Sequence, residues 1–508
     1  MENKGKKAYR NIPKNKKGVV PNKELLDLLP RDLVLEFKAF VFEKKRKTIK
    51  IAAVDPDNKM LRQYVKERLG DEAEWFYTTD EDITFVLKNY LRDFRKEIES
   101  IIADKSDING NVAILVDSII EFAFAEKASD LHIEPLRDET VIRFRIDGVL
   151  QNMAKIPRPM HQSVVARFKV LADLKIDENR RPQDGRIELE KYPDTILRIS
   201  TIPTLFGEKV AARILNDTNK TLAIADLGFS KEQEQILLRN IEKPFGMIVA
   251  SGPTGAGKTT TLYMILGFLK KEDINISTLE DPVEYSLDGI NQIQINPRLD
   301  LTFASGLRSL LRQDPDAIMV GEIRDSETAV MAANAAMTGH LVFTTIHTND
   351  APSAFVRLLE MNVEDFVVAS TVNLVIAQRL VRRVCTACAE EQSLSEAVIR
   401  KIKERGDIMA SIKKLYPNSE GILEKRKFKV GKGCDICIGT GYVGRVGLFE
   451  LLELNKEIHD LILTHAPAER IREAADKQGF RDMIIDGIQK VFDGATSFEE
   501  VIRTTRIT

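Results

Sequence analysis

The sequence has little cysteine, almost no tryptophan and no long hydrophobic run. Four cysteines and one tryptophan occur in 508 residues. Four cysteines are too few to hold such a chain together with disulfides, and their pairing as Cys385-x-x-Cys388 and Cys434-x-x-Cys437 indicates a metal in a reducing compartment. No apolar stretch reaches the roughly 20 residues that a membrane helix needs, and the chain begins without the apolar core of a signal peptide. We therefore expect a cytoplasmic protein that contacts a membrane only through partners.

The net charge is also small, at −2. It gives no overall electrostatic reason for binding nucleic acid. Apolar residues make up 43% of the chain and charged residues 30%, which is typical of a globular protein. A chain of this length is expected to form roughly three to four domains.

Residues 1–23 carry eight Lys/Arg against one Glu and few large apolar side chains. Such a segment cannot bury enough surface to fold alone, so we expect a flexible basic tail. Strand-like and helix-like segments then predict three α/β domains, over residues 24–105, 106–220 and 221–508. In the last domain, apolar strands alternate with helices, which predicts a parallel sheet.

Apolar periodicity and turn residues predict the main elements. The expected strands lie at 48–54, 140–146, 246–250, 317–320 and 341–346, and the expected helices at 60–69, 112–127 and 260–270. Asp147-Gly148 is expected to form a turn after the second of these strands. Arg143 and Arg145 alternate with apolar residues on that strand, so one face should be buried and the other cationic.

Residues Gly252–Thr259 fit the pattern G-x-x-x-x-G-K-[ST] between a predicted strand and a predicted helix. Glycines let backbone N–H groups surround phosphate oxygens, and the helix N-terminus adds positive potential. Lys258 should neutralise the β- and γ-phosphates, and the Thr259 hydroxyl should ligate Mg²⁺. The predicted nucleotide-binding residues are Gly252, Pro253, Thr254, Gly255, Ala256, Gly257, Lys258, Thr259 and Thr260.

An ATPase that does mechanical work also needs a metal-linked acid and a carboxylate that orients water. Glu322 follows the apolar strand 317–320 and is the candidate for the metal-linked acid. A second acidic cluster, at 280–284, follows another apolar–polar run, and one of its carboxylates is a candidate general base. An Asn-Lys-x-Asp motif, which a GTPase would need to read its base, is not present.

Several ordered motifs make the chain resemble the secretion ATPases of type II secretion and type IV pilus assembly. The resemblance covers nearly everything from residue 111 onward. Its motifs are the P-loop, the Asp-box-like 279–284, the segment 311–325, the His-box-like 338–350, and upstream 128–135 and 143–148. It implies a RecA-like ATPase core preceded by a PAS-like α/β domain and a small docking domain like the first domain of type II secretion ATPases.

The resemblance also assigns roles. It implies that Glu284 polarises the attacking water, that Glu322 is the Walker B acid, and that His340 and His347 line the site. The segment 198–213 matches the part of the family that supplies arginines to the nucleotide from the preceding domain, which nominates Arg198 and Arg213. Guanidinium groups would stabilise the charge of the transferring phosphoryl group.

The family further implies a hexameric ring that acts on a polytopic inner-membrane platform protein. The docking domain is expected to bind a membrane-anchored partner. Some relatives carry a cyclic-di-GMP-binding segment with Arg-Leu-Gly repeats. The basic tail has none of these repeats, which argues against regulation by that dinucleotide.

The cysteines occur as two pairs, Cys385-x-x-Cys388 and Cys434-x-x-Cys437. Two matched pairs favour a tetrahedral zinc site over a redox-active pair. Nearby glycines suit tight knuckle turns, and a helical excursion over 393–416 is expected within the insertion at 385–440. In the family, assembly and type II secretion ATPases carry such an insertion and retraction ATPases usually lack it, which favours assembly.

The leading interpretation is therefore a hexameric motor that hydrolyses ATP, with Mg²⁺, to assemble a type IV pilus or a secretion pseudopilus. A DNA-uptake or DNA-transfer motor of the same fold is the alternative. The sequence lacks a basic stripe with interleaved aromatic residues, which is the pattern that would predict direct contact with nucleic acid. A nucleotide-gated scaffold that barely turns over is a third class. The joint presence of Lys258, Glu284 and Glu322 argues against it.

Overall fold

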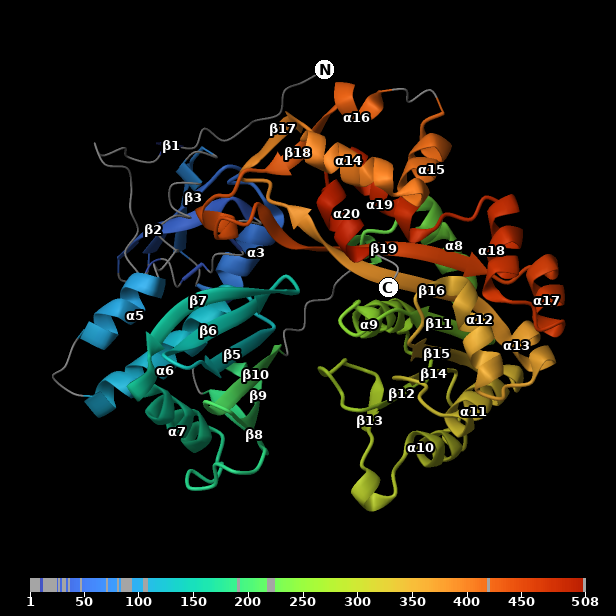
Figure 1. The fold of residues 1–508 in the computed structure, drawn as a ribbon, viewed down its shortest axis with the longest axis horizontal. Helices are drawn as coiled ribbons and strands as arrows, with labels where there is room; N and C mark the ends of the chain where they lie inside the picture. Colours follow the sequence, from blue (N-terminus) through green and yellow to red (C-terminus); the bar gives the residue numbers. More distant parts are fainter. Residues whose placement is uncertain are drawn as a thin grey trace.

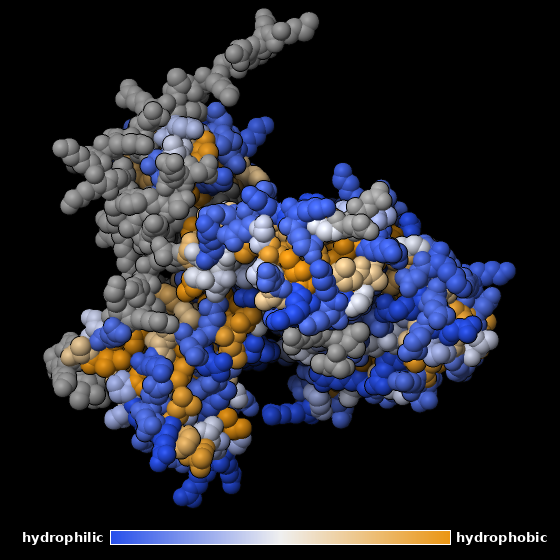
Figure 2. All heavy atoms as spheres, turned by 45° about the horizontal axis from the view of Figure 1, so that its top comes forward, coloured by the Kyte–Doolittle hydropathy of each residue, from blue (hydrophilic) through white to orange (hydrophobic). Residues whose placement is uncertain are grey.

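The computed structural model describes residues 10–11, 25, 28–29, 33–34, 37–45, 48–69, 72–79, 82–83, 94–103, 108–189, 192–216, 224–417 and 421–505. These residues form an α/β protein with three separate main sheets, as the sequence predicts (Figure 1). No helix among them is long and apolar enough to cross a membrane. On the face in Figure 2, hydrophilic residues surround smaller hydrophobic patches.

The N-terminal domain is built on a small mixed sheet with the strand order β1-β4-β3-β2. Its elements are β1 (Arg10–Asn11), β2 (Ala39–Lys45), β3 (Thr48–Ala53), α3 (Lys59–Arg68) and β4 (Glu72–Tyr77). The predicted strand 48–54 and helix 60–69 are confirmed to within a residue. Residues 10–11 of the predicted tail instead pair with β4, and the rest of 1–23 lies outside the described residues.

The second domain carries an antiparallel sheet in the order β7-β6-β5-β10-β9-β8. Its strands are β5 (Asp130–Pro135), β6 (Glu139–Ile146), β7 (Val149–Pro157), β8 (Gln183–Leu189), β9 (Tyr192–Thr204) and β10 (Gly207–Asn216). Its helices are α5 (Phe94–Ala103), α6 (Ile108–Ala125) and α7 (His161–Leu171). The predicted helix at 112–127 begins four residues earlier, and the predicted turn at Asp147-Gly148 joins β6 to β7. On β6, Arg143 and Arg145 pair with acids of β5.

The third domain has a seven-stranded sheet in the order β13-β12-β14-β15-β11-β16-β19, parallel except for the β16–β19 pair. Its strands are β11 (Gly246–Ser251), β12 (Ile276–Glu280), β13 (Asn291–Gln294), β14 (Ala317–Val320), β15 (Leu341–Ile346), β16 (Val372–Val384) and β19 (Tyr442–Glu453). Strands β11, β12, β14 and β15 are buried along their whole length. This explains why β11, β14 and β15 read as predominantly apolar runs, whereas β12 also buries Ser277, Thr278 and Glu280.

Two apolar clusters cover the faces of this sheet. One includes α11 and α12, and the other includes α8 and α9. The helices before β16 are α8 (Lys231–Ile241), α9 (Lys258–Leu269), α10 (Phe303–Leu310), α11 (Ser326–Met337), α12 (Ala351–Glu360) and α13 (Asp365–Thr371). Because β11 leads directly into the loop before α9, the sheet presents that loop at the carboxyl ends of its parallel strands.

The remaining elements form the cysteine insertion and the C-terminal helices. The insertion contains β17 (Ala389–Ser393), α14 (Glu396–Glu404), α15 (Gly406–Leu415), α16 (Ile422–Lys425) and β18 (Lys427–Gly431). Helices α14 and α15 confirm the predicted helical excursion. The C-terminal helices are α17 (Lys456–Leu463), α18 (Ala468–Lys477), α19 (Met483–Phe492) and α20 (Phe498–Thr504).

Candidate nucleotide and metal sites

The loop at Gly252–Thr259 connects β11 to α9 in the conformation that a phosphate cradle requires. Gly252, Gly255 and Gly257 have φ angles of 145°, 78° and 87°, where side chains other than hydrogen are disfavoured. Gly252 also lies so close to β16 that a Cβ would stand 2.5 Å from the carbonyl oxygen of Gln378. Helix α9 begins at Lys258, so its N-terminal N–H groups and dipole point into the loop.

Lys258 lies inside this loop and is only 8% exposed. Its Nζ donates to the carbonyl oxygens of Gly252, at 2.8 Å, and Pro253, at 3.2 Å. Burial lowers the pKa of Lys258, and the charge of Glu322 opposes that shift. The lysine is thus held where a phosphate bound to the loop would meet it.

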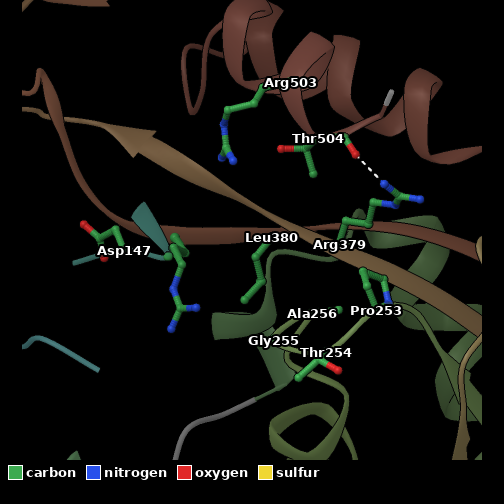
Figure 3. A pocket seen from close by; sticks show the side chains of 11 residues that line it. Asp147, Pro253, Thr254, Gly255, Ala256, Arg379, Leu380, Arg503 and Thr504 are labelled. Carbon is green, nitrogen blue, oxygen red and sulfur yellow. Dashed lines mark hydrogen bonds between the residues drawn. The ribbon is translucent and has the colours of Figure 1, made fainter. Parts of the chain in front are cut away.

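A cavity of about 180 Å³ lies on the β16 side of the loop (Figure 3). Its walls are the loop itself, β16, the start of β19, the end of α20 and the β6–β7 turn of the second domain. The lining residues are Asp147, Gly148, Pro253, Thr254, Gly255, Ala256, Arg379, Leu380, Arg445, Arg503 and Thr504. No sequence motif indicates Arg379, Arg445 and Arg503, which come from segments far apart in the chain.

Hydrogen bonds fix the walls of this cavity. Gln378 on β16 donates from Nε2 to the carbonyl oxygen of Ala256, at 2.7 Å. Arg379 donates from Nη1 to the carbonyl oxygen of Thr504, at 2.6 Å, as the dashed line in Figure 3 shows. The carboxylate of Asp147 accepts from the backbone N–H of Gly444, at 2.8 Å. The second domain is therefore hydrogen-bonded to the strand that lines the cavity.

On the other side of β11, the predicted acids collect at the carboxyl ends of β12 and β14. Glu322 follows β14, and its Oε1 lies 2.5 Å from Nη2 of Arg324. Its Oε2 lies 3.6 Å from Nε2 of His347. Arg324 also lies 3.6 Å from Asp281. Arg324 and His347 thus hold the Glu322 side chain beside the P-loop edge.

The cluster at 280–284 is joined to α9 by Tyr263. Buried Glu280 accepts from the Tyr263 hydroxyl and from Thr278 Oγ1, the latter at 2.6 Å. The backbone N–H of Glu284 donates to the same tyrosine oxygen, at 3.4 Å. Burial and the charges of Glu280 and Glu284 raise the pKa of Tyr285 to about 12. The Glu280 carboxylate is therefore buried and hydrogen-bonded to Tyr263 and Thr278, whereas Glu284 is exposed.

The two histidines of the His-box-like segment lie at opposite ends of β15. The β11–β15 register pairs Leu341 with Gly246 and Ile346 with Ser251. His347 is thus at the P-loop edge, and His340 is about 20 Å away at the other edge, given the rise of a strand. His340 Nδ1 bonds the carbonyl oxygen of Ala335 at the end of α11, at 2.9 Å. His340 therefore lies at the edge of the sheet away from the P-loop of its own chain, whereas His347 lies beside that loop.

Arg198 and Arg213 lie directly opposite each other on β9 and β10. Arg213 Nε is 3.1 Å from Oδ1 of Asp130 on β5, and Arg198 also faces Arg186 on β8. Neither of the two predicted arginines lines the cavity beside the P-loop. The second domain reaches that cavity with its β6–β7 turn instead.

The four cysteines converge, as the two-pair pattern predicts. Their Sγ atoms all lie within 4.8 Å of one another, with separations of 3.9 Å for Cys385–Cys434, 3.9 Å for Cys388–Cys437 and 3.7 Å for Cys434–Cys437. Ligands about 2.3 Å from a tetrahedral zinc ion lie about 3.8 Å apart. The cluster therefore has the dimensions of a tetrathiolate zinc site, and burial raises the pKa of the Cys385 thiol.

Two family models match the chain. Residues 105–503 match the model described as type II/IV secretion system protein. Residues 15–97 match the model of the MshEN domain. The latter match begins inside the segment predicted to be a basic tail, and the pairing of β1 with β4 likewise extends the domain toward the N-terminus.

Curated relatives are similar over most of the chain. It is 36% identical over 503 residues to the type IV pilus assembly ATPase PilB of Myxococcus xanthus, covering 95% of this chain and 87% of that protein. It is 42% identical over 393 residues to the type II secretion system protein HxcR of Pseudomonas aeruginosa, covering 77% of each.

Solved structures share the fold at lower identity. The ATPase DotB of Legionella pneumophila has a TM-score of 0.54 and 21% identity, over 76% of this chain and 94% of that one. The pilus retraction motor PilT, solved with bound ADP, has a TM-score of 0.50 and 22% identity, over 77% and 96%. These matches confirm the multidomain α/β ATPase fold predicted from the sequence.

Proposed function

Because this chain belongs to the type II/IV secretion system protein family, we propose that it is a hexameric motor that hydrolyses ATP to assemble a type IV pilus or a type II secretion pseudopilus. The observation that carries the proposal is the P-loop on β11, with Glu322 at the end of the neighbouring parallel strands and His347 beside it. A protein that only binds nucleotide would need the P-loop but neither Glu322 nor His347.

Each residue of the site has a role in phosphoryl transfer. When ATP binds, the Lys258 ammonium group would leave the carbonyl oxygens of Gly252 and Pro253 and bind the β- and γ-phosphates. A cation interacts more strongly with phosphate oxygens than with carbonyl oxygens. The hydroxyl of Thr259, at the start of α9, and the carboxylate of Glu322 would hold Mg²⁺. That ion neutralises phosphate charge when bound. Glu284, exposed on the loop after β12, orients the attacking water and accepts its proton.

The arginines of the second domain would complete the site after a domain movement or in a neighbouring subunit. Arg213 is exposed and Arg198 is half-buried, and among the described ion pairs only Asp130 pairs with Arg213. Guanidinium groups stabilise the charge of the transition state. If hydrolysis requires these two arginines, and they belong to a separate domain, hydrolysis would be coupled to rotation of that domain.

The cavity with Arg379, Arg445 and Arg503 lies on the side of the P-loop away from Glu322. This is the side on which the ribose and base would extend from the phosphates. We assign it to the nucleoside part of ATP, with Leu380 giving an apolar contact. The four cysteines would hold a structural zinc ion, because four thiolates leave no coordination position for a substrate.

The proposed partners are a polytopic inner-membrane platform protein for the motor and a membrane-anchored protein for the N-terminal domain, so the chain would work at the cytoplasmic side of that membrane. The test is ATP turnover by the purified chain with detergent-solubilised platform protein or with DNA, together with its mass in solution. Stimulation by the platform protein and a hexameric mass support the proposal. Stimulation by DNA alone would instead favour a DNA-transport motor.

A further inference from the structure

The four-cysteine cluster shares a hydrophobic core with the N-terminal domain. One apolar cluster joins buried residues of β2, β3 and α3 to Cys385, Ile436 and Cys437, with Cys388 and Cys434 packed at its edge. In Figure 1, the orange segment that precedes β19 lies beside the blue elements β2, β3 and α3. Two segments more than 300 residues apart in the sequence thus share one apolar cluster.

Ile436 provides the main apolar contact from the cysteine side. It lies between Cys434 and Cys437 in the short helical turn Asp435–Cys437, yet it is only 6% exposed. A side chain on so short a surface turn is buried only if another element covers it, and the cluster that contains it is otherwise built from the N-terminal domain and the cysteines. Ile438, two residues later, packs instead against the core of the second domain.

The conformation that presents Ile436 depends on the sulfur atoms. The backbone N–H groups of Cys434 and Gly441 both donate to Sγ of Cys437, at 3.1 Å. Gly431 and Gly441 approach so closely that a Cβ on Gly431 would lie 2.0 Å from the Gly441 carbonyl oxygen. Such N–H···S bonds strengthen when the sulfur is a thiolate, and clustered thiolates need a cation to offset their repulsion.

We propose that the turn around Ile436, hereafter the cysteine knuckle (residues 434–441), is the docking site for the chain's own N-terminal domain, and that a bound zinc ion keeps it in the docking conformation. This rests on the zinc site proposed above and not on ATP hydrolysis. A domain as small as residues 25–83 buries a small core of its own, so the shared cluster stabilises it. Loss of the metal would release the domain from the motor.

The cysteine knuckle is covalently connected to the strands of the motor domain that line the nucleotide cavity. Cys385 follows directly after β16, and Tyr442 begins β19 just beyond the knuckle. The same two strands carry Arg379 and Arg445 in the wall of the nucleotide cavity. A partner that pulled the N-terminal domain away would therefore act on the strands next to the P-loop.

The test is hydrogen–deuterium exchange on the full-length chain carrying Ile436→Asp. A carboxylate cannot be buried against the apolar N-terminal sheet without a large desolvation cost. We expect amide exchange over residues 39–53 to accelerate by about tenfold or more, with zinc content kept at one ion per chain. The matched control is Leu463→Asp, which also replaces an apolar side chain by a carboxylate but at an exposed residue of α17, and exchange over 39–53 should then stay as in the wild type.

A second arm removes the metal through Cys437→Ser, and it should accelerate exchange over the same residues. Fluorescence of Trp75, the single tryptophan, checks that the N-terminal domain remains folded, because this side chain packs within the domain under Arg62. Unchanged exchange over 39–53 in zinc-loaded Ile436→Asp would overturn the proposal. Nucleotide binding measured in the same variants separates this failure from a failure of the proposed ATPase function.

Discussion

Glu450 on β19 is a fully buried carboxyl group whose titration should make the stability of the motor domain depend on pH. It accepts hydrogen bonds from the backbone N–H groups of Ala351 and Met483, the first residues of α12 and α19. Burial raises its pKa from 4.5 to about 7, opposed by Arg472 and reinforced by Asp350 and Asp482. One side chain thus holds two helix N-termini against the sheet.

The sign of the effect follows from which state holds the proton. In the unfolded chain the carboxyl releases its proton near pH 4.5, whereas in the folded chain it keeps the proton to about pH 7. Its contribution to stability is therefore fully present below pH 4.5 and is lost as the pH rises through 7. With these two pKa values, the free energy of unfolding should fall by about 2.5 kcal/mol between pH 5 and pH 8 from this group alone.

The perturbation that tests this is Glu450→Gln, which has nearly the same shape and stays neutral at every pH. The assay is pulse proteolysis in urea at pH values from 5 to 8, comparing wild type with variant at each pH so that other groups cancel. We expect the wild type to lose about 2.5 kcal/mol relative to the variant across this range. A difference that stays constant with pH would refute the assignment of a raised pKa to Glu450.

Three further outcomes are expected at the sites. Gly252→Ala should weaken nucleotide binding, measured by calorimetry, by about tenfold or more. The new Cβ would lie 2.5 Å from the carbonyl oxygen of Gln378, and backbone strain of this kind costs about 1–3 kcal/mol. An affinity like that of the wild type would contradict the cradle geometry. His347→Ala should lower kcat by about tenfold. His340→Ala, at the opposite end of β15, should change kcat little but lower the melting temperature. Equal losses of kcat in the two variants would contradict the separation of the two histidines. Cys437→Ser should remove zinc from the purified chain, measured by mass spectrometry of the metal, and retention of one zinc ion would contradict the tetrathiolate site.

Motifs whose chemistry fixes residue spacing were predictable from the sequence. The P-loop and the strands 317–320 and 341–346 lie where the sequence predicts them, because buried parallel strands read as predominantly apolar runs between turn residues. The convergence of the cysteines was predictable from their two-pair spacing. Each of these features is encoded in a short segment.

Features that depend on contacts between distant segments were not predictable in this way. Arg379, Arg445 and Arg503 meet only because β16 and β19 pair antiparallel and α20 packs beside them. His340 shares a motif with His347, but a strand between them separates the two by its whole length. The packing of Ile436 on the N-terminal domain joins segments that are far apart in the sequence, and no periodicity in either segment indicates it.

We propose above that this chain hydrolyses ATP at the P-loop with Glu322 as the metal-linked acid. The most direct test is steady-state release of phosphate by the purified wild type and by Glu322→Ala, with nucleotide binding measured in both. We expect turnover by the wild type, and in the variant retained ATP binding with turnover reduced by at least about a hundredfold. Turnover by Glu322→Ala at the wild-type rate, or a well-folded wild type that binds ATP without hydrolysing it, would contradict the claim.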